Sequence, residues 1–211
     1  MALAPRWLDR NLTRLELVAV IAIFTVLIAT FATQAVVVFA RAEQRFLDAS
    51  ILNMNSVLGI YGFQLLADGR GEELARLRGT NPLALQPLLR SVQDPEMLMR
   101  YPELGSLAAG LSAILNDYQG EFDLADPAQF DGGMWYFERA DGTLVYRVQN
   151  DEFFRSGLAG AARIRYRLDV QFEDRDGNRR FTPGSDLYVK LVIAPQNPST
   201  WIFFQDARDN D

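Results

Sequence analysis

The most regular feature of the hydrophobic pattern is an apolar run near the amino terminus. Residues 17–40 form 24 consecutive positions without a charged side chain. As an α-helix this run covers roughly 36 Å, which exceeds the ~30 Å hydrocarbon core of a bilayer. A secretory signal has a shorter apolar region of about 7–15 residues, and a buried core helix rarely stays uncharged for so long. The run therefore predicts a retained transmembrane helix.

Apolar positions continue at three- and four-residue steps beyond this run, and no proline lies within residues 6–81. The spacing predicts one helix from about residue 12 to residue 66, with a transmembrane half (17–40) and an amphipathic half (41–66). A helical receptor stalk is the alternative. The apolar positions of the second half are Ala42, Phe46, Ala49, Ile51, Leu52, Val57, Leu58, Tyr61 and Leu65.

The pattern changes again after the helix. Prolines punctuate residues 67–133, which we expect to hold short helices, one of them over 104–118, and an acidic loop over 123–133. Residues 134–211 read as strands, because apolar and polar positions alternate and Asp141-Gly142 suits a hairpin turn. The strands are expected at 134–139, 143–149, 163–173, 187–194 and 200–204.

Together these elements predict an α+β fold, in which the long helix packs on a carboxyl-terminal antiparallel sheet of about four to five strands. Residues 1–16 would form a short leader ahead of the span. Six aromatic side chains on the strands are interpreted as core rather than as a ligand site: Trp135, Tyr136, Phe137, Tyr146, Tyr166 and Phe172.

Composition narrows the function. The chain has 211 residues, a formal net charge of −6, no cysteine and no histidine. Thiolate nucleophiles, disulfides, histidine triads and the usual zinc sites are thereby excluded, and the acidic balance disfavours nucleic acid as a partner. We therefore expect a protein that is not an enzyme. Arginines ahead of the span mildly favour a cytoplasmic amino terminus, with residues 41–211 outside; in a bacterial cell the outside is the periplasm.

The entrance to the span reads Asn11-Leu12-Thr13-Arg14-Leu15-Glu16-Leu17 and continues in valine, isoleucine and alanine. This junction resembles the start of type IV pilins and type II secretion pseudopilins, in which Gly-Phe-Thr-Leu-Ile-Glu-Leu precedes an apolar helix. The resemblance covers about 30 residues. It implies a pilin-like fold, assembly with other pilin-like or assembly-platform membrane proteins, and a role for Glu16 in pairing with a neighbouring subunit.

Two departures from that family pattern change the expectation. Asn11 stands where the family is cleaved after glycine, and Arg14 stands at an apolar position. Burying Arg14 in a packed filament would cost a large desolvation energy. The departures favour an uncleaved accessory component. Alternatively, Glu16 simply meets the positive end of the helix dipole at the membrane interface.

Residues 174–186 resemble a calcium loop. Asp174, Asp176 and Asn178 offer oxygen atoms at alternate positions and Asp186 closes the loop, which suits a hard cation that takes six to eight oxygen ligands. Arg179 replaces the usual glycine and Arg180 adds a second positive charge. The alternative is an acidic turn neutralised by its own arginines.

A row of arginines alternates with the apolar residues of the longest expected strand: Arg163, Arg165 and Arg167. They are interpreted as a solvated face or a partner-binding face. The leading functional expectation is a non-catalytic, pilin-like component of the bacterial inner membrane, serving a type IV pilus or a type II secretion machine. The combination of leader, long helix and acidic loop also resembles accessory proteins of mannose-sensitive-haemagglutinin-type pili. A membrane-anchored periplasmic sensor is the alternative, and a membrane-tethered enzyme using carboxylates comes third.

Overall fold

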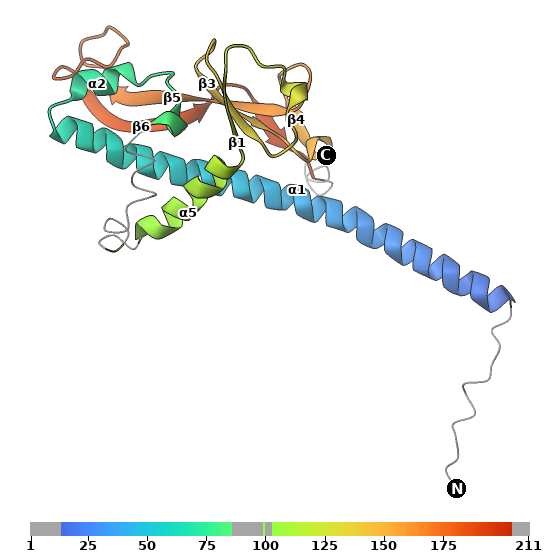
Figure 1. The fold of residues 1–211 in the computed structure, drawn as a ribbon. Coiled ribbons are helices and arrows are strands. Elements are labelled where there is room, and N and C mark those ends of the chain that lie inside the picture. Colours follow the sequence, from blue (N-terminus) through green and yellow to red (C-terminus); the bar gives the residue numbers. More distant parts are fainter. Residues whose placement is uncertain (1–13, 86–98, 100–102, 204–211) are drawn as a thin grey trace, which may run out of the picture. The chain divides into compact units, whose positions relative to one another are not determined.

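The computed structural model describes residues 14–85, 99 and 103–203, and the chain divides into two compact units, Met1–Phe39 and Ala40–Asp211. The long helix α1 (Arg14–Ala67) runs through both (Figure 1). Its bounds agree with the predicted helix, and the part of the expected leader that precedes residue 14 lies outside the described residues. The α+β class is confirmed.

In the first unit, residues 17–39 of α1 are almost entirely exposed, and the helix is long and apolar enough to cross a membrane. Three threonines interrupt the apolar surface, and each hydroxyl donates to a carbonyl one turn earlier. Thr25 donates to Ile21 O at 2.9 Å and Thr30 to Val26 O at 2.8 Å. Such bonds satisfy the hydroxyl within the helix, so these residues remain compatible with a lipid environment.

The second unit contains a mixed sheet of five strands in the order β1-β2-β3-β5-β6. A separate ribbon of two strands, β4 and β7, lies beside it in the fold (Figure 1). The elements after α1 are α2 (Gly71–Arg76), η1 (Pro82–Ala84), α5 (Glu103–Asn116), β1 (Tyr118–Phe122), η2 (Pro127–Gln129), β2 (Trp135–Glu138), β3 (Thr143–Arg147), η3 (Asp151–Phe153), β4 (Phe154–Ser156), β5 (Arg163–Glu173), β6 (Leu187–Pro195) and β7 (Ser199–Trp201).

Two expectations about the strands were wrong. The sheet is not wholly antiparallel, because β1 pairs in parallel with β2. Its sequence, Tyr-Gln-Gly-Glu-Phe, has a polar centre and only partly buried apolar ends, so it gave no strand pattern. The last expected strand, 200–204, does not join the main sheet over its described residues either, since Trp201 pairs with Phe154 of β4 in the ribbon; residue 204 lies outside the described residues.

The main core lies between α1 and one face of the sheet. Trp135, Tyr146 and Leu168 contribute from the strands and Met54 and Leu58 from the helix, all of them 2% exposed or less. Four of the predicted aromatic core residues lie in this cluster. Tyr136 is buried on the opposite face with Val145 and Ala125, and Phe172 is partly buried, so the core interpretation of the aromatic residues is confirmed.

The face of α1 that packs on the sheet differs in part from the predicted one. Ala42, Phe46, Ala49 and Leu52 are exposed. The helix carries two apolar stripes in this region, and periodicity alone does not identify the one that the sheet covers. The buried stripe consists of Ala40, Glu43, Leu47, Ser50, Met54, Val57, Leu58, Tyr61 and Leu65.

A second link between α1 and the sheet is polar. The side-chain amide of Asn55 accepts a hydrogen bond from Ile193 N at 2.7 Å and donates to Ile193 O at 3.4 Å. Ile193 belongs to β6, the last strand in the sheet order. Asn55 therefore binds the main chain of that strand on the side that faces away from β5.

Candidate functional site

The acidic loop between β5 and β6 brings three of its predicted ligands together. Carboxylate oxygens of Asp174, Asp176 and Asp186 lie within 4.8 Å of one another. Asn178 lies alongside, since its amide donates to Asp176 Oδ2 at 2.7 Å. Three of the four expected oxygen donors are thus clustered, whereas the side-chain oxygen of Asn178 accepts from Arg180 N at 2.6 Å. Carboxylate oxygens are the donors that hard divalent cations prefer.

Backbone N–H groups hold this loop in its folded form. Asp174 accepts hydrogen bonds from Gly177 N at 2.7 Å and Arg179 N at 2.9 Å. Arg179 adopts a positive φ of 61°, the conformation for which calcium loops commonly use glycine at this position. Among the described residues, neither Arg179 nor Arg180 forms an ion pair with a loop carboxylate.

Asp186 closes the loop by accepting from Arg175 N at 2.9 Å and from Thr182 N at 2.7 Å. Partial burial alone would raise the pKa of Asp186. The backbone N–H groups around its carboxylate outweigh that effect and hold the pKa below its usual value. The carboxylate that closes the loop is therefore kept in its charged form, the form in which it could bind a cation.

The predicted arginine row lies on the face of the sheet opposite α1, and its members are half-buried. Arg165 pairs with Glu138 at 3.1 Å and with Asp141, while Arg167 donates to Asp141 O at 2.6 Å. Arg163 donates to two main-chain carbonyl groups of the loop that precedes it. These arginines thus hold the β2–β3 turn and that loop, which leaves fewer of their donors for a partner.

The predicted membrane residues lie at the start of the described chain. Arg14 is the first residue of α1, and Glu16 lies exposed in its first turn. That position suits an interaction with the helix dipole, and it equally leaves the predicted pairing role open. The pairing of Glu16 with a neighbouring subunit stays a prediction.

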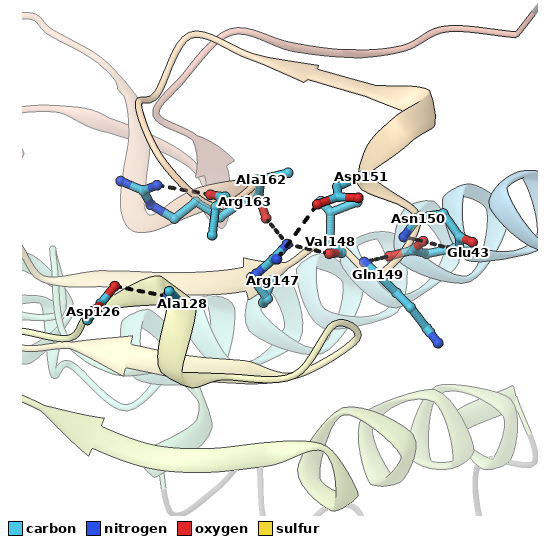
Figure 2. Close-up of polar contacts among 11 residues, drawn as sticks. Glu43, Asp126, Ala128, Arg147, Val148, Gln149, Asn150, Asp151, Ala162 and Arg163 are labelled. Carbon is cyan, nitrogen blue, oxygen red and sulfur yellow. Dashed lines mark hydrogen bonds and ion pairs between the residues drawn. The ribbon is translucent and has the colours of Figure 1, made fainter.

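Sequence reasoning missed Glu43, which is only 9% exposed. Its Oε1 accepts from Tyr146 Oη at 2.9 Å and from Gln149 N at 2.7 Å. Its Oε2 accepts from Asn150 N at 2.9 Å and from Asn150 Nδ2 at 2.6 Å. Figure 2 shows how Glu43 lies against Gln149 and Asn150. Burial and the negative charge of Glu43 raise the pKa of Tyr146, so the tyrosine stays a hydrogen-bond donor. The sequence signal that could have indicated the burial of Glu43 was its spacing. Glu43 lies three residues after Ala40 and four residues before Leu47, which places it within the buried stripe.

A cavity of about 400 Å³ lies beside the acidic loop and was also not predicted. Its polar wall contains Arg180 and the ion pair between Arg78 and Asp169, whose Nε and Oδ1 atoms are 3.2 Å apart. Val170, Phe172, Phe181 and Ala75 form the apolar wall. Because Asp169 neutralises Arg78, the remaining positive charge of the lining comes from Arg180.

Comparison of the chain with protein-family models, curated proteins and solved structures found no match.

Proposed function

We propose that this protein is a non-catalytic, pilin-like component of the bacterial inner membrane that acts in the assembly of a type IV pilus or a type II secretion machine. The observation that carries the proposal is the double use of α1. Its first half is an apolar helix that is exposed throughout the described part of its unit, whereas its second half contributes to the core of the sheet unit. A single helix used in both ways suits a membrane-anchored assembly subunit.

Contacts in the membrane would come from small residues of the span. Ala22, Ala29, Ala32 and Ala35 are all exposed on α1. Small side chains let helices approach closely, and close packing drives helix association in lipid. Other pilin-like or assembly-platform proteins are the proposed partners, with residues 41–211 docking in the periplasm.

The anchor is tested by carbonate extraction of membranes from cells that make the full chain. We expect the wild-type protein to stay in the pellet and the double variant Leu27→Arg/Ile28→Arg to be released, since each arginine at the centre of a span costs about 2.5–3.5 kcal/mol. Leu52→Arg/Ile60→Arg is the matched control, because both residues are exposed in the outer unit. Release of the wild-type chain would refute the anchor.

The assembly role is tested by photo-crosslinking in the native host from a probe at Ala32. We expect adducts with pilin-like or assembly-platform membrane proteins if the alanine face is the contact, and none of these from a matched probe at Ile23, which is exposed on the opposite face of the helix. Adducts formed only with unrelated membrane proteins from both positions would refute the role.

A periplasmic sensor is the second candidate, and one observation favours it: the cavity beside the acidic loop, with its two arginines and aromatic wall. Isothermal titration of the full chain with small aromatic and aliphatic carboxylates decides this alternative. Saturable binding that Arg180→Ala abolishes would support a sensor, and the absence of any heat of binding would count against it.

A further inference from the structure

The β4–β7 ribbon contains a cluster of aromatic side chains outside the main sheet. The ring centroids of Phe154 and Trp201 are 5.2 Å apart, and Phe203 stacks against Trp201 at 6.3 Å and against Phe153 at 6.1 Å. Phe153, Phe154 and Phe203 are buried, while Trp201 is half-buried and Ile202 is 41% exposed. The buried rings pack beneath Trp201, which is partly exposed, and Ile202, which is exposed.

Two contacts fix this ribbon beside the start of the outer half of α1. The guanidinium carbon of Arg41 lies 5.2 Å from the centroid of the Phe203 ring. Glu43 binds the main-chain N–H groups of Gln149 and Asn150, which directly precede η3 and β4 (Figure 2). The ribbon is therefore held within the second unit at the helical turn formed by residues 40–43.

That turn comes directly after the uncharged run 17–40. A helix of this length covers roughly 36 Å and the hydrocarbon core about 30 Å, so Arg41 falls in the headgroup layer, which is roughly 5–7 Å thick on each side. Because Phe203 contacts Arg41, the ribbon reaches the same depth. Tryptophan is enriched at this depth, and long basic side chains extend into it.

We propose that the β4–β7 ribbon is a lipid-contacting surface, in which Trp201 and Ile202 enter the phospholipid headgroup layer next to the span. Arg155 is exposed on the ribbon itself and Arg45 is exposed one helical turn after Arg41, so both can complement lipid phosphate groups. The contact gives the outer unit a second point of attachment to the bilayer besides its covalent link. This inference rests on the proposed membrane anchor.

The absence of cysteine allows a clean labelling experiment on the full chain. Ile202→Cys and Arg155→Cys each receive an NBD fluorophore, and the proteins are reconstituted into phosphatidylcholine vesicles that contain phosphatidylglycerol. Val189→Cys is the control. Val189 is 50% exposed on β6 and follows Tyr188, whose ring lies 5.2 Å from the ring of Phe63. Phe63 lies roughly 33 Å along α1 from Arg41, so Val189 is far from the ribbon.

Lipids that carry a nitroxide at the headgroup serve as quenchers. We expect about a twofold loss of emission at position 202, a smaller loss at 155 and none at 189, because quenching acts only near the headgroup layer of ~5–7 Å. Equal emission with and without quencher at both 202 and 155, or equal quenching at 189, overturns the proposal.

Carbonate extraction of the same vesicles separates this proposal from the anchor on which it rests. A carbonate-resistant protein without quenching at 202 overturns the ribbon contact alone. A protein released by carbonate overturns the anchor and the ribbon contact together. Circular dichroism of each labelled variant confirms that it retains the wild-type fold.

Discussion

Replacing Glu43 by glutamine tests the buried polar link between α1 and the segment that leads to β4. The substitution keeps the size and shape of the side chain but leaves it one oxygen atom instead of two. Each Glu43 oxygen accepts two hydrogen bonds, and each oxygen binds one main-chain N–H group. Whichever way the new amide turns, the main-chain N–H group of Gln149 or of Asn150 faces another donor and loses its partner.

The cost follows from that count. A buried N–H group without an acceptor costs about 1–3 kcal/mol, and hydrogen bonds to a neutral acceptor are weaker than those to a charged one by roughly 1 kcal/mol. We expect Glu43→Gln to lower the free energy of unfolding by about 2–4 kcal/mol. Tyr146→Phe removes one bond and orphans no main-chain group, so it should cost less, about 1–2 kcal/mol.

The assay is urea unfolding of the full chain in detergent micelles, followed by tryptophan fluorescence, because Trp135 is fully buried in the core. With a slope of about 2 kcal/mol per molar urea, the expected loss moves the midpoint by roughly 1–2 M. Glu152→Gln is the control, since Glu152 is exposed in the same region and should stay within ~0.5 kcal/mol of wild type. A stability of Glu43→Gln equal to that of the control would refute the reasoning.

Three further predictions concern the leader, the acidic loop and the buried tyrosines. Prepilin peptidase should leave the chain intact because Asn11 replaces the glycine at the cleavage point, as intact-mass measurement in the native host will show. Calcium at 10–100 times its Kd should stabilise the outer unit through residues 174–186 by about 1–3 kcal/mol, seen as a melting shift of several degrees that Asp176→Ala removes. Burial raises the pKa of Tyr118 and Tyr136 to about 12. The contribution of the two neutral side chains to folding stability is therefore complete below pH ~10, the pKa of tyrosine in the unfolded chain, and is lost as the pH rises through about 12. Tyrosinate absorbance should rise together with loss of the circular dichroism signal of the fold.

Each of these predictions has a contrary outcome. A mature terminus at Leu12 would show that the chain is cleaved, as filament subunits are, and would favour the pairing role of Glu16. A calcium shift shared equally by wild type and Asp176→Ala would place the cation elsewhere; Asp131→Ala, an exposed acid outside the loop, should keep the full shift. Tyrosine ionisation near pH 10 with the fold retained would show that these rings are accessible to solvent.

The long helix and its apolar first half could be predicted from sequence because an uncharged run and an unbroken helical period are local signals. The acidic loop was predictable for the same reason, since its donors alternate within 13 residues, and three of them do converge. Strand β1 was not, because its pairing with β2 depends on a neighbour and not on its own polar sequence. Glu43 was missed because a charge within a buried stripe is acceptable only once distant donors, here at residues 146–150, surround it.

The hydrogen bonds between Asn55 and Ile193 also determine how this protein can meet its neighbours. An outer strand normally offers free main-chain groups to which another chain can add a strand, a route to irreversible aggregation. On β6 the Asn55 amide occupies that main-chain position, an irregularity near Phe172 distorts the ladder, and Pro195 ends the strand. A strand of another chain that approached β6 would therefore find the main-chain groups of Ile193 already bonded, which disfavours the addition of a strand at this edge.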